Sequence, residues 1–325
     1  MEDVLIRREG RAGRITLTRP RALNALTHDM CRAIDAALID WANDPEVALV
    51  LIEGEGERAF CAGGDVAEIY RAGLRGDFAL GRDFWRDEYR MNVRIAEYRK
   101  PVVSFLHGFV LGGGVGLGAH GSHRIVGESV QVSMPECGIG LIPDVGGTHR
   151  LALAPGRAGE YLGLTGARMG PEDALYARFA DAFVPEADWP ALKARLVEGD
   201  LDAIARMAER PPAGRLAALA DDPGEFAAEA LKVLRRNSPL SMAMTLAMVG
   251  SPAAAESVRT AIAQEFRATW RLVPEGDFLE GVRAQIIDKD RNPRWQHAGP
   301  EEVPEAMVVA LLAPLGKDEL DLEGL

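Results

Sequence analysis

The sequence predicts an α/β core followed by a mostly helical C-terminal part, and three observations support this. Continuous apolar runs typical of buried strands occur at residues 47–52 and 102–106. Predicted strands and helices alternate up to about residue 185. Beyond that point, residues 187–210, 213–236, 239–249 and 252–272 show no strand-like alternation and are rich in residues that favour helices. We therefore expect a core domain over residues 1–195 and a helical region over residues 196–325.

The first elements are predicted to be a hairpin and a helix. Residues 4–6 and 14–17 alternate like two strands, and residues 10–13 supply the turn between them. Thr27 is placed to cap a helix over residues 29–42, whose apolar positions recur at helical spacing. After the buried strand at 47–52 comes a glycine-rich loop at 61–65, and then a charge-rich helical stretch. Short strands are expected again at 124–126 and 130–133, and a helix at 171–177.

Two glycine clusters each follow a predicted buried strand. Gly63 and Gly64 lack a Cβ, so a ligand can approach their N–H groups closely, although a simple turn explains them equally well. The second cluster, residues 108–118, opens a predicted helix, whose N-terminus suits an oxyanion or a phosphate. Its Gly116, Gly118 and Gly121 match the dinucleotide fingerprint formally. The next strand follows too soon for a crossover helix, which argues against a nicotinamide cofactor.

Two carboxylates, Glu136 and Asp144, stand eight residues apart, and each follows a proline. The segment between them is mostly apolar. An acid in an apolar environment has a raised pKa, and two neighbouring acids push their pKa values apart, which suits general acid–base chemistry. Each carboxylate could instead cap a helix or accept loop N–H bonds. These residues alone leave both interpretations open.

Composition excludes several classes of protein. The formal net charge is -12, which disfavours non-specific nucleic acid binding but not a small anionic ligand. The three cysteines, Cys31, Cys61 and Cys137, are too few for a disulfide framework, so we expect reduced thiols. No signal peptide and no apolar run near 18 residues is evident, so we expect a cytoplasmic protein without a membrane partner. His120 and His123 have no evident third ligand nearby, so no metal site is expected.

The pieces together resemble the crotonase (enoyl-CoA hydratase/isomerase) superfamily. Residues 19–26 look like its first coenzyme A loop, and residues 59–65 and 107–114 look like its two oxyanion-hole loops. Within the superfamily, the 3-hydroxyisobutyryl-CoA hydrolase family is the most similar. The stretches that carry this second resemblance are residues 84–89, 134–136, 140–147, 278–284 and 287–290.

The resemblance implies ββα turns wound into a spiral, with a helical C-terminal region and the acyl-CoA site in the core. By position, Gly64 and Gly113 would supply oxyanion-hole N–H groups, and Glu136 and Asp144 match the catalytic carboxylates. Glu88 matches a residue that lines the substrate pocket. The other substrate-binding positions would be Arg21, Ala22, Leu23, Ala62 and Gly63. Coenzyme A is then part of the substrate rather than a cofactor, no metal is implied, and a homo-oligomer is compatible with the superfamily.

One departure from the hydratases bears on the reaction. Hydratases of the superfamily carry a second glutamate where this sequence has Gly116, and Asp144 supplies a different second acid. This favours hydrolysis of a short-chain hydroxyacyl-CoA, with 3-hydroxyisobutyryl-CoA of valine catabolism as the expected substrate. The alternatives are an enoyl-CoA hydratase or isomerase of the same superfamily, and a non-catalytic protein on this fold that binds coenzyme A or RNA.

Overall fold

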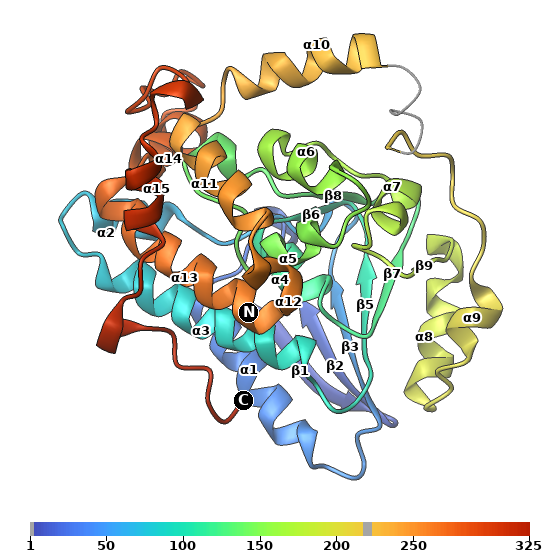
Figure 1. Ribbon diagram of the computed structural model, residues 1–325. Coiled ribbons are helices and arrows are strands. Elements are labelled where there is room, and N and C mark those ends of the chain that lie inside the picture. Colours follow the sequence, from blue (N-terminus) through green and yellow to red (C-terminus); the bar gives the residue numbers. More distant parts are fainter. Residues whose placement is uncertain (1–2, 217–222) are drawn as a thin grey trace. The chain divides into compact units, whose positions relative to one another are not determined.

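The computed structural model describes residues 3–216 and 223–325 (Figure 1). The chain divides into two compact units by its internal contacts. Unit 1 contains Met1–Gly64, Arg90–Ser133 and Arg168–Ala217, and unit 2 contains Asp65–Tyr89, Met134–Ala167 and Ala218–Leu325. Each unit is therefore assembled from three separate stretches of the chain. The predicted regions, residues 1–195 and 196–325, are each one continuous stretch of the sequence, and this division stays a prediction.

Unit 1 is built around a six-stranded sheet with the order β1-β2-β3-β5-β7-β9. Its strands are β1 (Val4–Glu9), β2 (Ala12–Leu17), β3 (Leu49–Gly54), β5 (Val102–Leu106), β7 (His123–Val126) and β9 (Ala182–Phe183). β1 and β2 form the predicted antiparallel hairpin, and every later pairing in this sheet is parallel. β3 and β5 are buried along almost their whole length, which explains their continuous apolar runs.

A second, smaller sheet gives the fold its spiral character. It contains β4 (Ala59–Cys61), β6 (Phe109–Leu111) and β8 (Gln131–Ser133), all parallel. Each winding of the chain places one strand in the large sheet and the next in the small one, as β3 then β4, β5 then β6, and β7 then β8. The structure therefore has the predicted α/β class with ββα turns. β4, β6 and β9 were not predicted, because strands of two or three residues rarely show a period.

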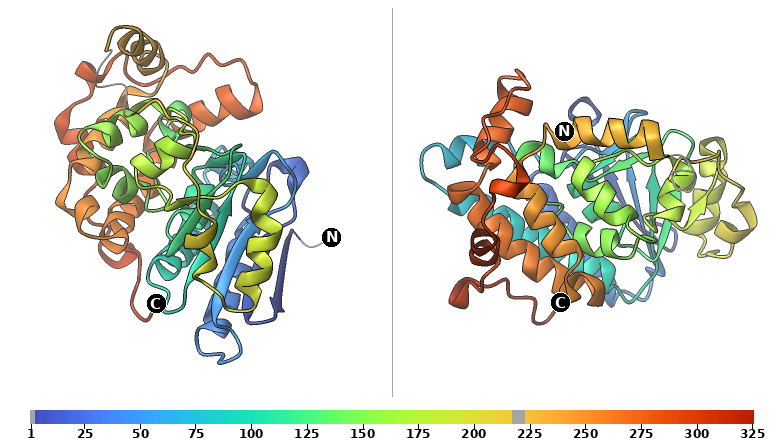
Figure 2. Two further views of the ribbon diagram at one scale, coloured as in Figure 1. Left: turned by 90° about the vertical axis from the view of Figure 1, so that its right-hand side faces the viewer. Right: turned by 45° about the horizontal axis from the view of Figure 1, so that its top comes forward.

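Helices cover both faces of the large sheet. α8 (Trp189–Val197) and α9 (Ala203–Met207) lie alongside its strands (Figure 2). Their apolar side chains pack on alternate strand residues, including Leu49 and Leu51 of β3 and Phe105 of β5. α1 (His28–Ala42) packs on the opposite face, since a Cβ at Gly13 would lie 2.4 Å from the Trp41 ring. Thr27 caps α1 as predicted, accepting a bond from the Met30 N–H at 3.2 Å.

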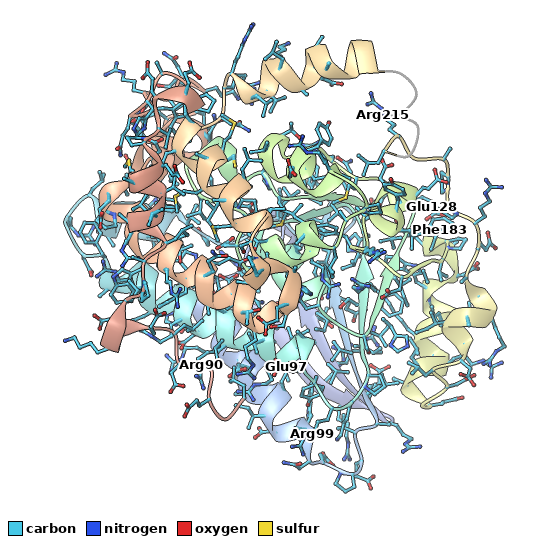
Figure 3. The ribbon with its side chains drawn as sticks, in the orientation of Figure 1. Arg90, Glu97, Arg99, Glu128, Phe183 and Arg215 are labelled. Atoms are coloured by element: carbon cyan, nitrogen blue, oxygen red, sulfur yellow. The ribbon has the colours of Figure 1, made fainter. Side chains whose placement is uncertain are left out.

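A hydrogen bond joins the loops that follow β7 and β9. Glu128 follows β7, and its carboxylate accepts a hydrogen bond from the Glu186 N–H at 2.9 Å. Figure 3 accordingly shows Glu128 beside Phe183 of β9. The strand β7 begins five residues after α4 (Gly113–Gly118) ends, so the formal dinucleotide fingerprint lacks its crossover helix here.

Unit 2 is helical. It contains the first part of α3 (Ala79–Ala96), which continues into unit 1, and short 3-10 segments such as η2 (Glu136–Ile139). The other helices of this unit are α2 (Ala67–Gly73), α5 (Gly147–Ala152), α6 (Ala158–Thr165), α10 (Pro223–Leu234), α11 (Pro239–Val249), α12 (Pro252–Glu256), α13 (Val258–Glu275), α14 (Phe278–Val282), the π-helical turn Arg283–Ile287 and α15 (Glu305–Leu311). None of the helices in the described part of the chain could cross a membrane.

Several predicted helices are interrupted. Residues 252–272 form α12 and α13, because Ser257 is extended and its side chain caps α13 at the Thr260 N–H. Residues 187–210 form α8 and α9, with Gly199 in a left-handed conformation between them. α7 (Pro171–Tyr176) occupies the predicted helix at 171–177. Of the predicted helix at 213–236, residues 217–222 lie outside the described residues. Residues 213–216 are not helical, and α10 covers Pro223–Leu234.

Candidate active site

The two glycine loops of unit 1 start from the same edge of the small sheet. β4 and β6 are parallel neighbours, so the loops that follow them leave side by side. Gly63 has a φ of +104°, a conformation that favours glycine, and a Cβ there would lie 3.5 Å from the Leu111 carbonyl oxygen at the end of β6. Among the described residues, the backbone N–H groups of Gly64 and Gly113 donate to no protein acceptor. Both N–H groups are therefore candidates to donate to a ligand oxygen.

The helix α4 approaches β4 so closely that only glycine fits between them. A Cβ at Gly114 would lie 2.2 Å from the Cys61 carbonyl oxygen, far inside van der Waals contact. Gly112, the residue before the helix, has a φ of 47° and a ψ of −114°, a combination that L side chains rarely adopt. These glycines set the first turn of α4, including Gly113, directly against the strand that leads to Gly64.

A third segment of unit 1 anchors the first glycine loop. The Leu26 N–H donates to the Gly63 carbonyl at 2.9 Å, and the Ala62 N–H donates to the Leu23 carbonyl at 3.0 Å. These bonds bring together the positions assigned by resemblance to the acyl-CoA loops, which are Arg21, Ala22, Leu23, Ala62, Gly63 and Gly64. Arg21 and Ala22 are exposed, in the short turn η1 (Pro20–Ala22).

Asn24 holds this anchor in place, and the sequence analysis did not identify its role. It is fully buried and lies in the left-handed region with a φ of 54°. Its side-chain amide donates to the carbonyls of Glu55 and Ala59, each at 2.9 Å, and its Oδ1 accepts from the Arg19 N–H. The available signal was the residue type, because asparagine tolerates a left-handed backbone better than most residues.

Unit 2 contains four buried carboxyl groups that interact electrostatically, which we call the acid cluster. Glu136 begins η2, Asp144 lies in the turn before α5, Glu88 lies on α3, and Glu265 lies on α13. All four are at most 4% exposed. Buried carboxyl groups are rare unless they are paired or functional. Three of the four were predicted site residues, and Glu265 was not.

Glu136 is held by backbone contacts but its side chain lacks a full set of partners. The Leu141 N–H donates to its carbonyl oxygen at 3.0 Å, closing the η2 turn. Its carboxyl Oε2 is buried and has no hydrogen-bond partner. Burial, and secondarily the charge of Asp144, raise the pKa of Glu136 well above the usual range. Glu88 has the same character, since its Oε1 is unpartnered and burial raises its pKa strongly.

Asp144 is oriented by a tyrosine. The Tyr89 hydroxyl donates to Asp144 Oδ2 at 2.7 Å, and both side chains are buried. Burial raises the pKa of Asp144 to about 7, although the Tyr89 hydrogen bond favours the ionised form. Because Asp144 and Glu136 interact, ionising one disfavours ionising the other. The pair can therefore hold one proton between them near neutral pH, which is the requirement for general acid–base work.

Glu265 supports the turn that carries Asp144. Its carboxyl group accepts bonds from the Gly146 N–H at 2.7 Å and the Thr148 N–H at 2.9 Å, and also from the Thr148 hydroxyl. Burial raises the pKa of Glu265 to about 8, while those hydrogen bonds act in the opposite direction. The signal in the sequence was an acid inside the apolar stripe of a helix. The buried positions on that face of α13 include 258, 261, 262, 265, 266, 269 and 272.

The structure thus places the predicted site residues in two groups. Gly64, Gly113 and the acyl-CoA loops lie in unit 1, and the predicted carboxylates Glu88, Glu136 and Asp144 lie in unit 2. Their functional roles stay proposals. Within residues 3–216 and 223–325, no group of three or more His, Cys, Asp or Glu side chains is arranged to hold a metal ion.

The family model and similar known sequences indicate the same family. The model of a family described as enoyl-CoA hydratase/isomerase matches residues 12–215 and 203–312. The chain is 37% identical to the mitochondrial 3-hydroxyisobutyryl-CoA hydrolase of Gallus gallus, over 98% of this chain and 91% of that protein. It is 36% identical to the Homo sapiens protein of the same name, over 98% of this chain and 90% of that protein.

Solved structures with the same fold carry different functional descriptions. A structure described as an enoyl-CoA hydratase from Rhodobacter sphaeroides is 57% identical, with a TM-score of 0.95, and the match covers 98% of this chain and 100% of that one. A structure described as a carnitinyl-CoA dehydratase from Mycobacterium thermoresistibile is 40% identical, with a TM-score of 0.93 and complete coverage of both chains.

Proposed function

The chain belongs to the enoyl-CoA hydratase/isomerase family, the crotonase superfamily, and we propose that it hydrolyses a short-chain hydroxyacyl-CoA thioester. The observation that carries this proposal is the buried, interacting pair Glu136 and Asp144. Position 116, where hydratases of the superfamily have a second glutamate, is a glycine. The acids available for catalysis are therefore those of the acid cluster.

The glycine loops would stabilise the developing oxyanion. In this proposal the N–H groups of Gly64 and Gly113 donate to the thioester oxygen. Negative charge grows on that oxygen as the carbonyl becomes tetrahedral, so fixed donors stabilise the transition state more than the substrate. Loss of one such donor costs roughly 3 kcal/mol of barrier in comparable sites.

Glu136 would act either as the general base or as the nucleophile. As a general base, its ionised carboxylate takes a proton from water, and the resulting hydroxide attacks the thioester carbonyl. The C–S bond then breaks, and the proton passes to the thiolate so that coenzyme A leaves as a thiol. As a nucleophile, Glu136 would instead form an anhydride that water cleaves in a second step. A raised pKa makes the ionised Glu136 a stronger base than an ordinary carboxylate, which suits the first route.

The proposed substrate is 3-hydroxyisobutyryl-CoA, giving 3-hydroxyisobutyrate and coenzyme A in valine catabolism. The names of the relatives from Gallus gallus and Homo sapiens support this choice. Asp144 would accept a hydrogen bond from the substrate hydroxyl or share the proton with Glu136, and Glu88 would line the pocket. Coenzyme A enters as part of the substrate, and no other cofactor is proposed. A cytoplasmic location and a homo-oligomeric state also stay proposals, and the relatives themselves are described as mitochondrial.

The test is a panel of acyl-CoA thioesters assayed for thiol release. We expect hydroxyacyl-CoA thioesters of four carbons to be cleaved fastest. Glu136→Gln should abolish thiol release while coenzyme A binding persists, because the variant keeps the size of the side chain and loses its basicity. Near-wild-type hydrolysis by Glu136→Gln would remove Glu136 from the mechanism.

Hydration is the second candidate, because the Rhodobacter sphaeroides structure is described as an enoyl-CoA hydratase and shares 57% identity with this chain. The two reactions have separate signals. Hydrolysis releases a thiol, whereas hydration removes the absorbance of the conjugated double bond and releases none. Loss of that absorbance from an enoyl-CoA, without any thiol from the thioester panel, would replace the hydrolase proposal with a hydratase.

A further inference from the structure

The acid cluster contains one carboxyl group to which the proposed reaction gives no role. Glu265 is fully buried on α13, a helix that begins more than a hundred residues after Asp144. Its carboxyl group makes no ion pair among the described residues. Both of its oxygens instead accept hydrogen bonds from the two residues Gly146 and Thr148. A buried acid normally needs partners of this kind to offset its desolvation. Here both partners belong to the turn that follows Asp144.

The turn between Asp144 and Thr148 has an unfavourable backbone. Val145 has a φ of 55° and Gly146 a φ of 80°, so two successive residues lie in the left-handed region. A β-branched residue in that region is destabilised, and it persists only where neighbouring contacts enforce it. The Gly147 N–H closes the turn on the Asp144 carbonyl at 2.6 Å. The Gly146 and Thr148 N–H groups, on either side of Gly147, are the ones bound by Glu265.

We propose that Glu265 is a positioning residue that holds the Asp144–Thr148 turn in its left-handed form and so fixes the Asp144 carboxyl group against Tyr89 and Glu136. Tyr89 orients Asp144 from the side-chain end, through the bond to Oδ2, and Glu265 orients it from the backbone end. The inference about Asp144 in catalysis rests on the proposed hydrolase function. The inference about the turn does not.

Glu265 also belongs to the electrostatics of the cluster. The charge of Asp144 contributes to the raised pKa of Glu265, and the charge of Glu265 in turn contributes to the raised pKa of Glu136 and of Tyr89. These titratable groups face Glu265 from η2, from α3 and from the turn before α5. Replacing Glu265 by a neutral side chain therefore alters two observables at once, the geometry of the turn and the pH at which Glu136 ionises.

The test is the nearly isosteric variant Glu265→Gln. Glutamine has one acceptor oxygen, which can serve Thr148, and an NH₂ group that would face the Gly146 N–H donor to donor. We expect kcat for thioester hydrolysis to fall about 10- to 100-fold, the loss typical of one hydrogen bond to a charged group. KM should change little. Above about pH 8, where Glu265 carries its charge, the ionisation of Glu136 in the pH profile should move to lower pH, because the variant removes that negative charge.

A matched control separates this role from general destabilisation. Glu53 is a buried glutamate of unit 1 whose carboxylate accepts bonds from Thr16 and Arg14. Glu53→Gln should lower the melting temperature and leave kcat and the pH profile of the folded enzyme unchanged. If Glu265→Gln behaves like Glu53→Gln, the positioning role is wrong and Glu265 is only structural. If Glu265→Gln does not fold, Thr148→Val removes one donor to the same carboxyl group and should lower kcat in the same direction, and an unchanged kcat would equally refute the role.

Amide hydrogen exchange tests the turn without any assay of activity. In the wild-type chain the Gly146 N–H should be strongly protected, and Glu265→Gln should speed its exchange at least tenfold while exchange in α1 stays unchanged. Unaltered protection at Gly146 would overturn the inference even if the enzyme is a hydrolase. Conversely, a wild-type chain that cleaves no thioester would refute the proposed function, while the exchange experiment would still decide the role of Glu265 in the turn.

Discussion

Replacing Asp144 by asparagine should stabilise the protein at alkaline pH, although it should remove most of the activity. Burial raises the pKa of Asp144 from the ordinary 3.8 to about 7. In the unfolded chain Asp144 ionises near its ordinary pKa, whereas in the folded protein it keeps its proton until about pH 7. The folded state therefore loses stability as the pH rises from about 4 to 7, and the loss is complete above pH 7.

The size of the effect follows from the shift. About three pKa units at 1.36 kcal/mol each correspond to about 4 kcal/mol of unfolding free energy at pH 8. Asparagine has nearly the same shape, carries no charge, and its Oδ1 can still accept the Tyr89 hydroxyl. Asp144→Asn should therefore be more stable than the wild type by up to about 4 kcal/mol at pH 8 and by little at pH 4.

Denaturant unfolding between pH 4 and pH 8 measures the difference, and a control of opposite sign is available. Burial acts to raise the pKa of Glu53, but hydrogen bonds and charges from Arg14 and Lys193 outweigh it and lower the pKa to about 2. The ionised Glu53 stabilises the fold, so Glu53→Gln should lose about 3 kcal/mol at pH 8, and the deficit should shrink only below about pH 4. A stability difference for Asp144→Asn that is the same at every pH, or that favours the wild type at pH 8, would refute the reasoning.

Three further outcomes are expected. Glu136→Gln should lower kcat by at least about a thousandfold with the affinity for coenzyme A within about twofold of wild type, measured by thiol release and calorimetry. Tyr89→Phe removes the donor to Asp144, so the pKa of the Asp144 carboxyl group, followed by NMR titration of the folded protein, should rise by about 1–2; a lower pKa would contradict the geometry. Gly114→Ala forces a Cβ onto the Cys61 carbonyl and should lower the melting temperature and kcat together; a variant with both values unchanged would show that α4 can move away.

The elements that the sequence predicted correctly include those whose apolar pattern is regular along several residues. The apolar runs at β3 and β5 belong to strands covered on both faces, so their side chains show no alternation. The helix after Thr27 was placed to within one residue of its observed start, because a capping side chain and a helical apolar period coincide there. By contrast, residues 252–272 have helical composition throughout, and the extended backbone and capping side chain of Ser257 separate them into two helices.

Part of the candidate site could also be predicted from a local pattern in the sequence. Glu136 and Asp144 stand out because each follows a proline and faces an apolar segment, which is a local signal. Glu265 lies on another helix and reaches the same cluster only in the folded unit, so no local pattern connects it with Asp144. Asn24 is similar, since its three hydrogen bonds go to residues up to 35 positions away. Partners that are distant in sequence are fixed by tertiary packing, which a single sequence does not display.

The helix that carries Gly113 has a consequence for the order of folding. Four of the six residues of α4 are glycines, and each glycine disfavours a helix by about 1 kcal/mol relative to alanine. The segment is also far too short to be helical by itself in water. Its helical form therefore depends on the β4 backbone against which Gly114 packs. We expect α4 to form only after the strands around it have assembled, so the backbone donor at Gly113 should be among the last parts of the molecule to acquire its shape.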